Sequence, residues 1–120
     1  MKKYESLKSS RDFKRVYDKK CSYANKYLVM YVLRNELSKN RLGISVSKKV
    51  GNSVVRHRLT RLIRESYRLN EDLFKNGFDI VVIARVNSKE AGFKEIRDSL
   101  LYLSYLHNIL IRTPRFRYYF

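Results

Sequence analysis

The amino-acid sequence predicts a compact two-layer α/β sandwich, with a mixed four-stranded sheet and three helices in the order α-β-β-β-α-β-α. One observation is the alternation of apolar with small residues through residues 41–47, which is typical of a strand with one buried face. Another is the nearly continuous apolar run of residues 79–86, which is typical of a strand buried on both faces. Because an amphipathic helical segment separates these strands, they form a βαβ unit and run parallel.

Two further helices are predicted, one before and one after this unit in the chain. Ser9 and Asp12 have the spacing of a capping box, so a helix begins there and runs to about residue 19. Its apolar face contains Phe13, Val16 and Tyr17. The last helix starts between residues 88 and 93 and is ended by Pro114. Its apolar stripe contains Phe93, Ile96, Leu100, Leu103 and Leu110.

The remaining two strands precede residue 41. Residues 26–33 are rich in β-forming side chains and apolar on both faces, so both faces are expected to be covered at least in part. A shorter strand is expected at residues 21–24, and the polar residues 35–40 form a hairpin loop. Tyr31 shares a face with the odd-numbered residues of its strand.

Length and charge restrict the function. The chain has 120 residues, which predicts a single domain over residues 1–120 with a flexible tail at residues 112–120. Its 27 Lys and Arg residues outnumber 11 Asp and Glu residues, which gives a formal net charge of +16. This excess is spread along the chain and favours a polyanionic partner, either nucleic acid or an anionic membrane surface.

No apolar run reaches the length of a membrane span, and the first residues lack the apolar segment of a signal peptide. We therefore expect no membrane-spanning segment and no signal peptide, and we assign no membrane partner. Cys21 is the only cysteine, which excludes an intramolecular disulfide and a cysteine zinc cluster. These features predict a reducing, cytoplasmic location.

The central helical segment, residues 47–69, has the clearest functional pattern. Asn52 or Ser53 can cap it. Its apolar side contains Val55, Leu59, Leu62, Ile63 and Leu69, its opposite side contains His57, Arg61, Arg64 and Arg68, and Arg56 and Arg58 flank the boundary. A solvated helix face usually mixes both signs of charge, whereas a row of one sign is favourable only beside a polyanion. The guanidinium fork also suits phosphate oxygens. The pattern favours nucleic-acid contact over a merely solvated face.

The same residues resemble a known signature. The segment S-V-S-K-K-V-G-N-S-V-V-R-H-R-L-T-R-L-I-R-E is similar to the strand, turn and helix of the protein subunit of bacterial ribonuclease P. The matching positions are Lys48, Lys49, Gly51, Asn52, Arg56, Arg58, Arg61, Arg64 and Glu65. Two positions depart, since His57 replaces the usual Asn and Thr60 the usual Lys. A weaker resemblance extends over nearly all of the chain before the C-terminal tail.

The resemblance implies a fold, partners and roles. It implies a left-handed crossover in the βαβ unit, as in ribosomal protein S5 domain 2, and a role in removing the 5′ leader of precursor tRNA. The partner RNA carries out phosphodiester hydrolysis with Mg²⁺ that it mainly binds itself. Contacts with this RNA are expected from Lys48, Lys49, Asn52, Arg56, His57, Arg58, Arg61, Arg64 and Arg68. A cleft for the single-stranded leader is expected from Phe13, Tyr17, Tyr31, Ser45 and Ser47.

Other functions are weighed against this one. No arrangement typical of protein catalysis is evident, His57 and His107 lack the spacing of a helical metal motif, and Gly51 stands outside any glycine-rich phosphate loop. We assign no catalytic and no metal-binding residue, and no obligate protein partner. Charge and stripe alone support only an RNA-binding module. The alternatives are a ribosomal or other structural RNA-binding protein without a role in cleavage, and a nuclease that acts by itself.

Overall fold

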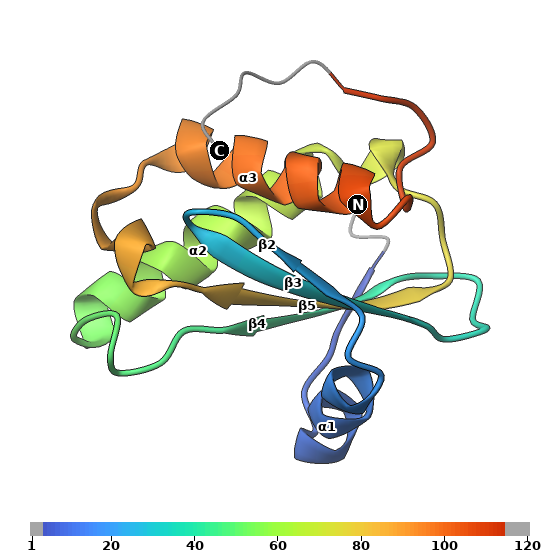
Figure 1. The fold of residues 1–120 in the computed structure, drawn as a ribbon, viewed down its shortest axis with the longest axis horizontal. Helices are drawn as coiled ribbons and strands as arrows, with labels where there is room; N and C mark the ends of the chain where they lie inside the picture. The colour runs from blue at the N-terminus through green and yellow to red at the C-terminus, as the bar shows by residue number, and fades with distance from the viewer. Residues whose placement is uncertain (1–3, 115–120) are drawn as a thin grey trace.

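The computed structural model describes residues 4–114, which form a mixed sheet with helices on both faces (Figure 1). The strands are ordered β1-β4-β5-β3-β2, with β4 parallel to β5 and β3 antiparallel to it. Their bounds are β1 Glu5–Ser6, β2 Ser22–Ala24, β3 Leu28–Arg34, β4 Arg41–Ser45 and β5 Phe78–Ala84. The helices are α1 Ser10–Asp18, α2 Ser53–Leu69 and α3 Phe93–Leu106, with short 3₁₀ helices at Glu71–Leu73 and Val86–Glu90.

The prediction of four strands was wrong, because β1 adds a fifth at the edge of the sheet. Glu5 pairs with Arg41 in parallel register, and the Leu7 amide donates to the Leu42 carbonyl at 2.8 Å. A two-residue strand is too short to show an alternating pattern. It pairs with β4 because the chain runs along this edge of the sheet before it enters α1.

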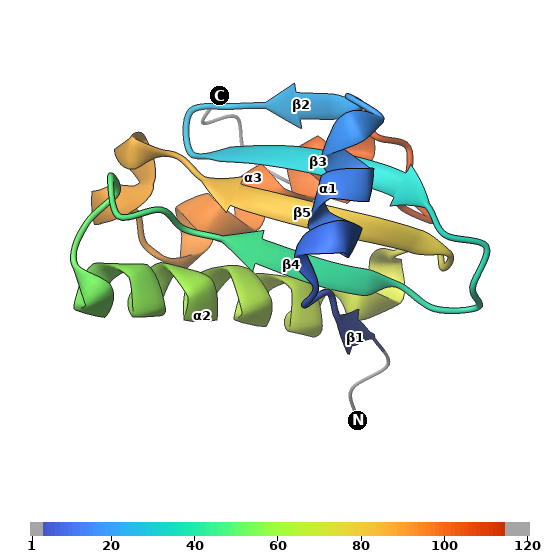
Figure 2. The ribbon, with the colours of Figure 1, turned by 90° about the horizontal axis from the view of Figure 1, so that it is seen from below.

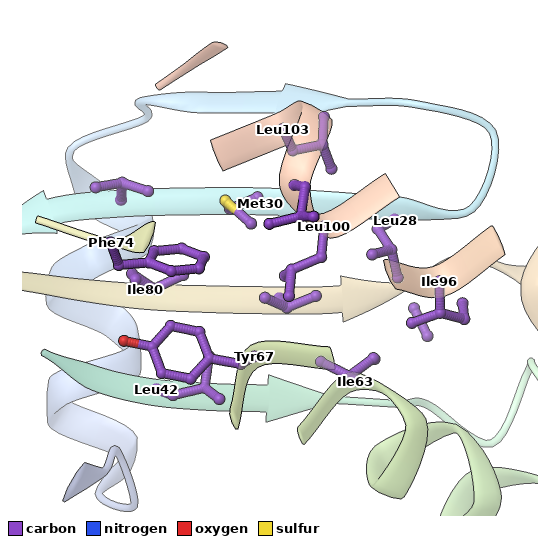
Figure 3. Packing of buried hydrophobic residues seen from close by; sticks show 14 of the residues in the cluster. Leu28, Met30, Leu42, Ile63, Tyr67, Phe74, Ile80, Ile96, Leu100 and Leu103 are labelled. Carbon is purple, nitrogen blue, oxygen red and sulfur yellow. The ribbon is translucent and has the colours of Figure 1, made fainter. Parts of the chain in front are cut away.

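The helices divide unequally between the two faces of the sheet. Helices α2 and α3 cover one face, and α1 crosses the other (Figures 1 and 2). Figure 3 shows the larger core, where apolar side chains of β3, β4 and β5 meet those of α2 and α3. A smaller cluster lies under α1, around Leu7, Val16 and Val81. Because α1 is short, it leaves part of its face of the sheet uncovered.

Both predicted N-terminal caps form, although the first is only half of a capping box. The Ser9 hydroxyl accepts a bond from the Asp12 amide at 3.1 Å. The Asp12 carboxylate lies near Arg15 and Arg41 instead. At the second helix Asn52 is the cap, since its side chain accepts from the Val55 amide at 3.0 Å.

The buried face of α2 differs from the predicted one at its end. Leu59 and Ile63 are fully buried as predicted, but Leu69 is 60% exposed. Tyr67, absent from the predicted face, is buried instead. Asn40 donates to its hydroxyl at 3.0 Å, and burial raises the pKa of Tyr67 to about 12. Leu69 is exposed because it lies on the flank of the helix, turned away from the line through Leu59, Ile63 and Tyr67.

Helix α3 is shorter than its apolar stripe predicts. It begins at Phe93, within the expected window, but ends at Leu106 rather than near Pro114. Asn108 adopts φ of 58°, the left-handed conformation that often stops a helix. Leu110 then forms an isolated bridge with Phe74 and is buried there. Its apolar side chain therefore belongs to the core, although it lies beyond the end of the helix. Residues 115–120 of the expected tail lie outside the described residues.

One buried carboxylate joins four segments of the chain. Asp79 of β5 is fully buried and accepts from Arg41 through both oxygens, at 2.8 and 2.7 Å. Asn35 donates to it at 2.9 Å and Arg15 of α1 at 3.4 Å. Burial raises the pKa of Asp79, but the bonds from Arg41 and Asn35 outweigh it and hold the pKa below 3.8. This contact ties α1 to the sheet.

Candidate nucleic-acid interface

The basic turn between β4 and α2 lies at one end of the sheet. The Val50 amide donates to the Ser47 carbonyl at 3.1 Å, and the buried Val50 side chain anchors the turn to the core. Lys48 and Lys49 are the two central residues of this turn, and both are exposed. The turn thus presents two ammonium groups just before the first turn of α2, where unpaired backbone amides also favour an anion.

The basic stripe of α2 faces solvent, as its helical spacing predicts. Its residues, all exposed, are His57, Arg61, Arg64 and Arg68. Arg68 donates to Glu65 at 2.6 Å, which raises the pKa of Arg68 and lowers that of Glu65. Within residues 4–114, Arg61 and Arg64 have no carboxylate partner. These two guanidinium groups are therefore available to phosphate oxygens.

Of the two arginines at the boundary of the stripe, Arg58 contacts the protein through its guanidinium, and Arg56 is half-buried. Arg58 donates to the Ala91 carbonyl at 2.8 Å and also to the Lys89 carbonyl, which links α2 to the loop before α3. Arg56 is half-buried, and its carbonyl accepts from the Thr60 hydroxyl at 2.9 Å. Arg58 thus has a structural contact that its sequence context gave no means of predicting.

The three predicted aromatic residues meet on the opposite face of the sheet. The Tyr17 ring of α1 packs edge-on against Tyr31 of β3, with centroids 5.0 Å apart, and Phe13 lies 6.2 Å from Tyr17. All three are half-buried, so each ring contacts the small cluster under α1 and keeps an exposed part. Ser45 hydrogen-bonds to Tyr17, whose pKa is raised by burial.

Gly43 sets how closely α1 approaches the sheet. A Cβ at this position would lie 2.6 Å from Cζ of Phe13, inside van der Waals contact. In the sheet Gly43 is opposite Val81, which is opposite Tyr31, so the row beneath α1 contains a glycine without a side chain, a medium side chain and a large one. Helix α1 therefore lies close against the small face of β4.

The next row of the sheet lies beyond α1 and is partly open. Ser45, Ile83 and Val29 are aligned across three strands and are only half-buried. Figure 2 shows the ends of β4 and β5 extending past α1, toward the end of the sheet where α2 begins. The structure therefore brings Phe13, Tyr17, Tyr31 and Ser45 to one surface. Ser47 is exposed in the basic turn just past the strand.

The carboxylates near these surfaces do not offer a metal site. Within residues 4–114, no group of three His, Cys, Asp or Glu side chains could hold a metal ion. Asp79 is surrounded by donors, and Glu65 is paired with Arg68. Such carboxylates already have cationic partners and are poor ligands for a second cation. Among the described residues, none of the helices is long and apolar enough to cross a membrane.

Sequence reasoning missed one feature of this region. Exposed Leu69 and half-buried Phe93 border a groove between α2 and α3, beside the basic stripe. Both were assigned to the core from their helical spacing. The only signal in the sequence was the place of Leu69 at the edge of the apolar stripe.

Comparison with known proteins identifies the family. The Ribonuclease P family model matches residues 1–106. A relative from Lachnoclostridium phytofermentans, named ribonuclease P protein component, is 62% identical over 106 residues, covering 88% of this chain and 91% of the relative. A relative of the same name from Clostridioides difficile is 54% identical over 97 residues, covering 80% and 85%.

Solved structures give the same result. The Staphylococcus aureus RNase P protein superposes with a TM-score of 0.80 at 38% identity, covering 87% of this chain and 95% of that one. The Thermotoga maritima RNase P protein gives a TM-score of 0.76 at 36% identity, covering 82% and 94%. Together with the basic turn, the arginine stripe and the aromatic face, these matches show that the chain belongs to the family of bacterial ribonuclease P protein components.

Proposed function

We infer that this chain is the protein subunit of ribonuclease P, which binds a catalytic RNA and precursor tRNA and promotes endonucleolytic removal of the 5′ leader. Family membership supports the overall activity. The observation that carries the residue-level proposal is the position of the basic turn, which continues directly from the strand that ends at Ser45 beside the aromatic rings. The protein can thus hold the precursor tRNA beside the catalytic RNA.

The two surfaces receive different roles in this proposal. The catalytic RNA lies along α2, where its phosphates contact Lys48, Lys49, Asn52, Arg56, His57, Arg58, Arg61, Arg64 and Arg68. The leader lies on the opposite face, against Phe13, Tyr17, Tyr31, Ser45 and Ser47. Aromatic rings stack on unpaired bases of any sequence, and this property suits a leader whose sequence varies between tRNAs.

Further assignments follow from the family. We propose that phosphate oxygens of the RNA subunit supply most of the ligands of Mg²⁺, since the carboxylates near the site are already paired. The metal would neutralise negative charge while the catalytic RNA hydrolyses the precursor tRNA. We also propose a single-domain protein that acts in the cytoplasm, with the family's left-handed crossover between β4 and β5.

A cleavage assay tests the proposed function. Precursor tRNA is incubated with this protein alone, with a bacterial ribonuclease P RNA alone at low Mg²⁺, and with both. The proposal expects leader removal only in the combined sample, or much faster there. Cleavage by the protein alone would show a self-sufficient nuclease. Binding of the RNA without any gain in cleavage would show a structural RNA-binding protein instead.

Replacing Phe13 with leucine is expected to weaken the reconstituted enzyme only on substrates with a longer leader. Leucine keeps most of the apolar volume above Gly43 but loses the flat ring. A stacked base is worth about 1–3 kcal/mol, so affinity should fall by about fivefold to more than a hundredfold for long leaders. Very short leaders should bind as before. The measurement is substrate affinity against leader length, and Tyr31→Leu should behave in the same way.

Tyr23→Leu is the matched control, since Tyr23 is an exposed aromatic residue of β2 paired with Met30, which faces the other side of the sheet. It should leave every substrate unaffected. Thermal unfolding of each variant reports any loss of packing. A defect of equal size at all leader lengths would assign Phe13 and Tyr31 to the core alone.

A further inference from the structure

The groove between α2 and the start of α3 has a mainly apolar floor and a cationic rim. Its volume is about 460 Å³, within the range of about 300–1,000 Å³ typical of ligand sites. Leu62, Leu69 and Phe93 form the floor. Leu69 is 60% exposed, and an isolated exposed leucine needs no explanation, but here it lies beside two other apolar side chains in a concave surface.

The rim has an excess of positive charge. Arg58, Arg61 and Arg68 border the groove, against the single carboxylate of Glu65. Glu65 is ionised, because the bond from Arg68 lowers its pKa. The guanidinium of Arg97 lies 5.9 Å from the centre of the Phe93 ring. The groove therefore attracts an anion, and its Glu65 carboxylate also accepts hydrogen bonds.

The walls of the groove are held in place by contacts on both helices. Arg58 donates to the Ala91 and Lys89 carbonyls, which fixes α2 to the loop before α3. The Gly92 amide donates to Glu95 at 2.7 Å and closes the first turn of α3, the turn that presents Phe93. The groove is thus preformed, and a ligand would not need to order it.

An apolar floor beside arginines favours a flat apolar group that carries a phosphate on each side. An unpaired nucleotide has this chemistry. A paired RNA helix offers phosphates and ribose to a protein, but its bases are enclosed, so it would leave the floor empty. A base amino group or a ribose 2′-hydroxyl could donate to Glu65, which a simple anion could not do.

We propose that this groove binds one unpaired nucleotide of the catalytic RNA, with the base against Leu62, Leu69 and Phe93 and the flanking phosphates on Arg61 and Arg68. The proposal rests on the proposed function, since it deepens the contact between α2 and that RNA. It adds a site that reads whether a nucleotide is unpaired. An acidic, apolar peptide is the competing occupant, and the experiment separates the two.

Leu69→Ser tests the site, because the side chain is exposed and its loss should not disturb folding. Binding to the catalytic RNA should weaken about five- to tenfold at every salt concentration. The slope of log affinity against log salt should not change, since an apolar contact releases no counterions. Arg61→Ala should instead lower the slope by about 1. Ile111→Ser is the control, because Ile111 is 62% exposed outside the groove.

Chemical probing of the RNA then identifies the nucleotide. One unpaired base should be protected by the wild-type protein and exposed with Leu69→Ser. An abasic nucleotide at that position should weaken wild-type binding and remove the difference between wild type and variant. Unchanged affinity and unchanged protection with Leu69→Ser would overturn the proposal that the groove binds a nucleotide. The groove would then bind another ligand, such as a peptide. Failure of the wild-type protein to bind the RNA at all would overturn the proposed function instead.

Discussion

Replacement of Asp79 with alanine is expected to destabilise the fold by about 3–5 kcal/mol, the usual cost of removing one partner from a buried ion pair. The carboxylate is fully buried, and its loss would leave the Arg41 guanidinium, also largely buried, without its main acceptor. The midpoint of thermal unfolding should fall by more than about 10 °C. Because Arg15 also reaches this carboxylate, α1 should loosen first, which amide hydrogen exchange would detect.

The matched control is Asp18→Ala, which removes an exposed ion pair with Lys14 and should change stability little. The pH dependence of unfolding gives a second check. The pKa of Asp79 is held below its ordinary value of 3.8, so its contribution is complete above about pH 4 and is lost as the pH falls through the folded-state value. The wild-type protein should therefore lose stability more steeply than Asp79→Ala below pH 4. Equal stability of the two proteins at pH 7 would contradict the prediction.

Replacement of both Arg61 and Arg64 with alanine is expected to weaken binding to the catalytic RNA by about 25- to 60-fold near 0.1 M salt. Each phosphate contact contributes about 0.7–0.9 to the slope of log affinity against log salt, so two contacts account for this difference relative to 1 M salt. The slope itself should fall by about 1.4–1.8, the sum of the two contacts. The loss should be similar for RNAs of different sequence, because phosphate contacts carry no base information.

The double variant should fold as the wild type does, since both side chains are exposed on the side of α2 away from Leu59 and Ile63. Lys94→Ala with Lys89→Ala, two exposed cations off the stripe, controls for net charge. Titration of labelled RNA at four or more salt concentrations gives both the affinity and the slope. If the control pair lowers the slope as much, the whole basic surface attracts RNA and the α2 stripe has no special role.

Local patterns in the sequence predicted most of the elements. The alternation in residues 41–47 reflects the two different faces of β4, one apolar and packed in the larger core and one small and approached by α1. Asn52 caps α2 because its short side chain reaches an amide three residues ahead. The exposed row of Arg61 and Arg64 follows from helical geometry alone. These features depend on side chains close together in the chain, so their periods are visible without a structure.

The candidate site was predicted unevenly for the same reason. Residues of the basic turn and of α2 are contiguous, and their common surface follows from one strand, one turn and one helix. Phe13 and Tyr31 lie on separate elements, and only the resemblance to the family placed them together. Their meeting depends on the absence of a side chain at Gly43, which lets α1 lie against the sheet, and on Asp79, which joins α1 to β4 and β5.

The sequence by itself determined the charge, the main helices and strands, and the direction in which the basic stripe points, since each depends on composition or short-range periodicity. Tertiary structure decided the fifth strand, the end of α3 and the exposure of Leu69. In each case an apolar or extended segment could have been buried or paired in more than one way. The choice was made by neighbours far away in the chain: β4 beside β1, Phe74 beside Leu110, and Tyr67 filling the core in place of Leu69.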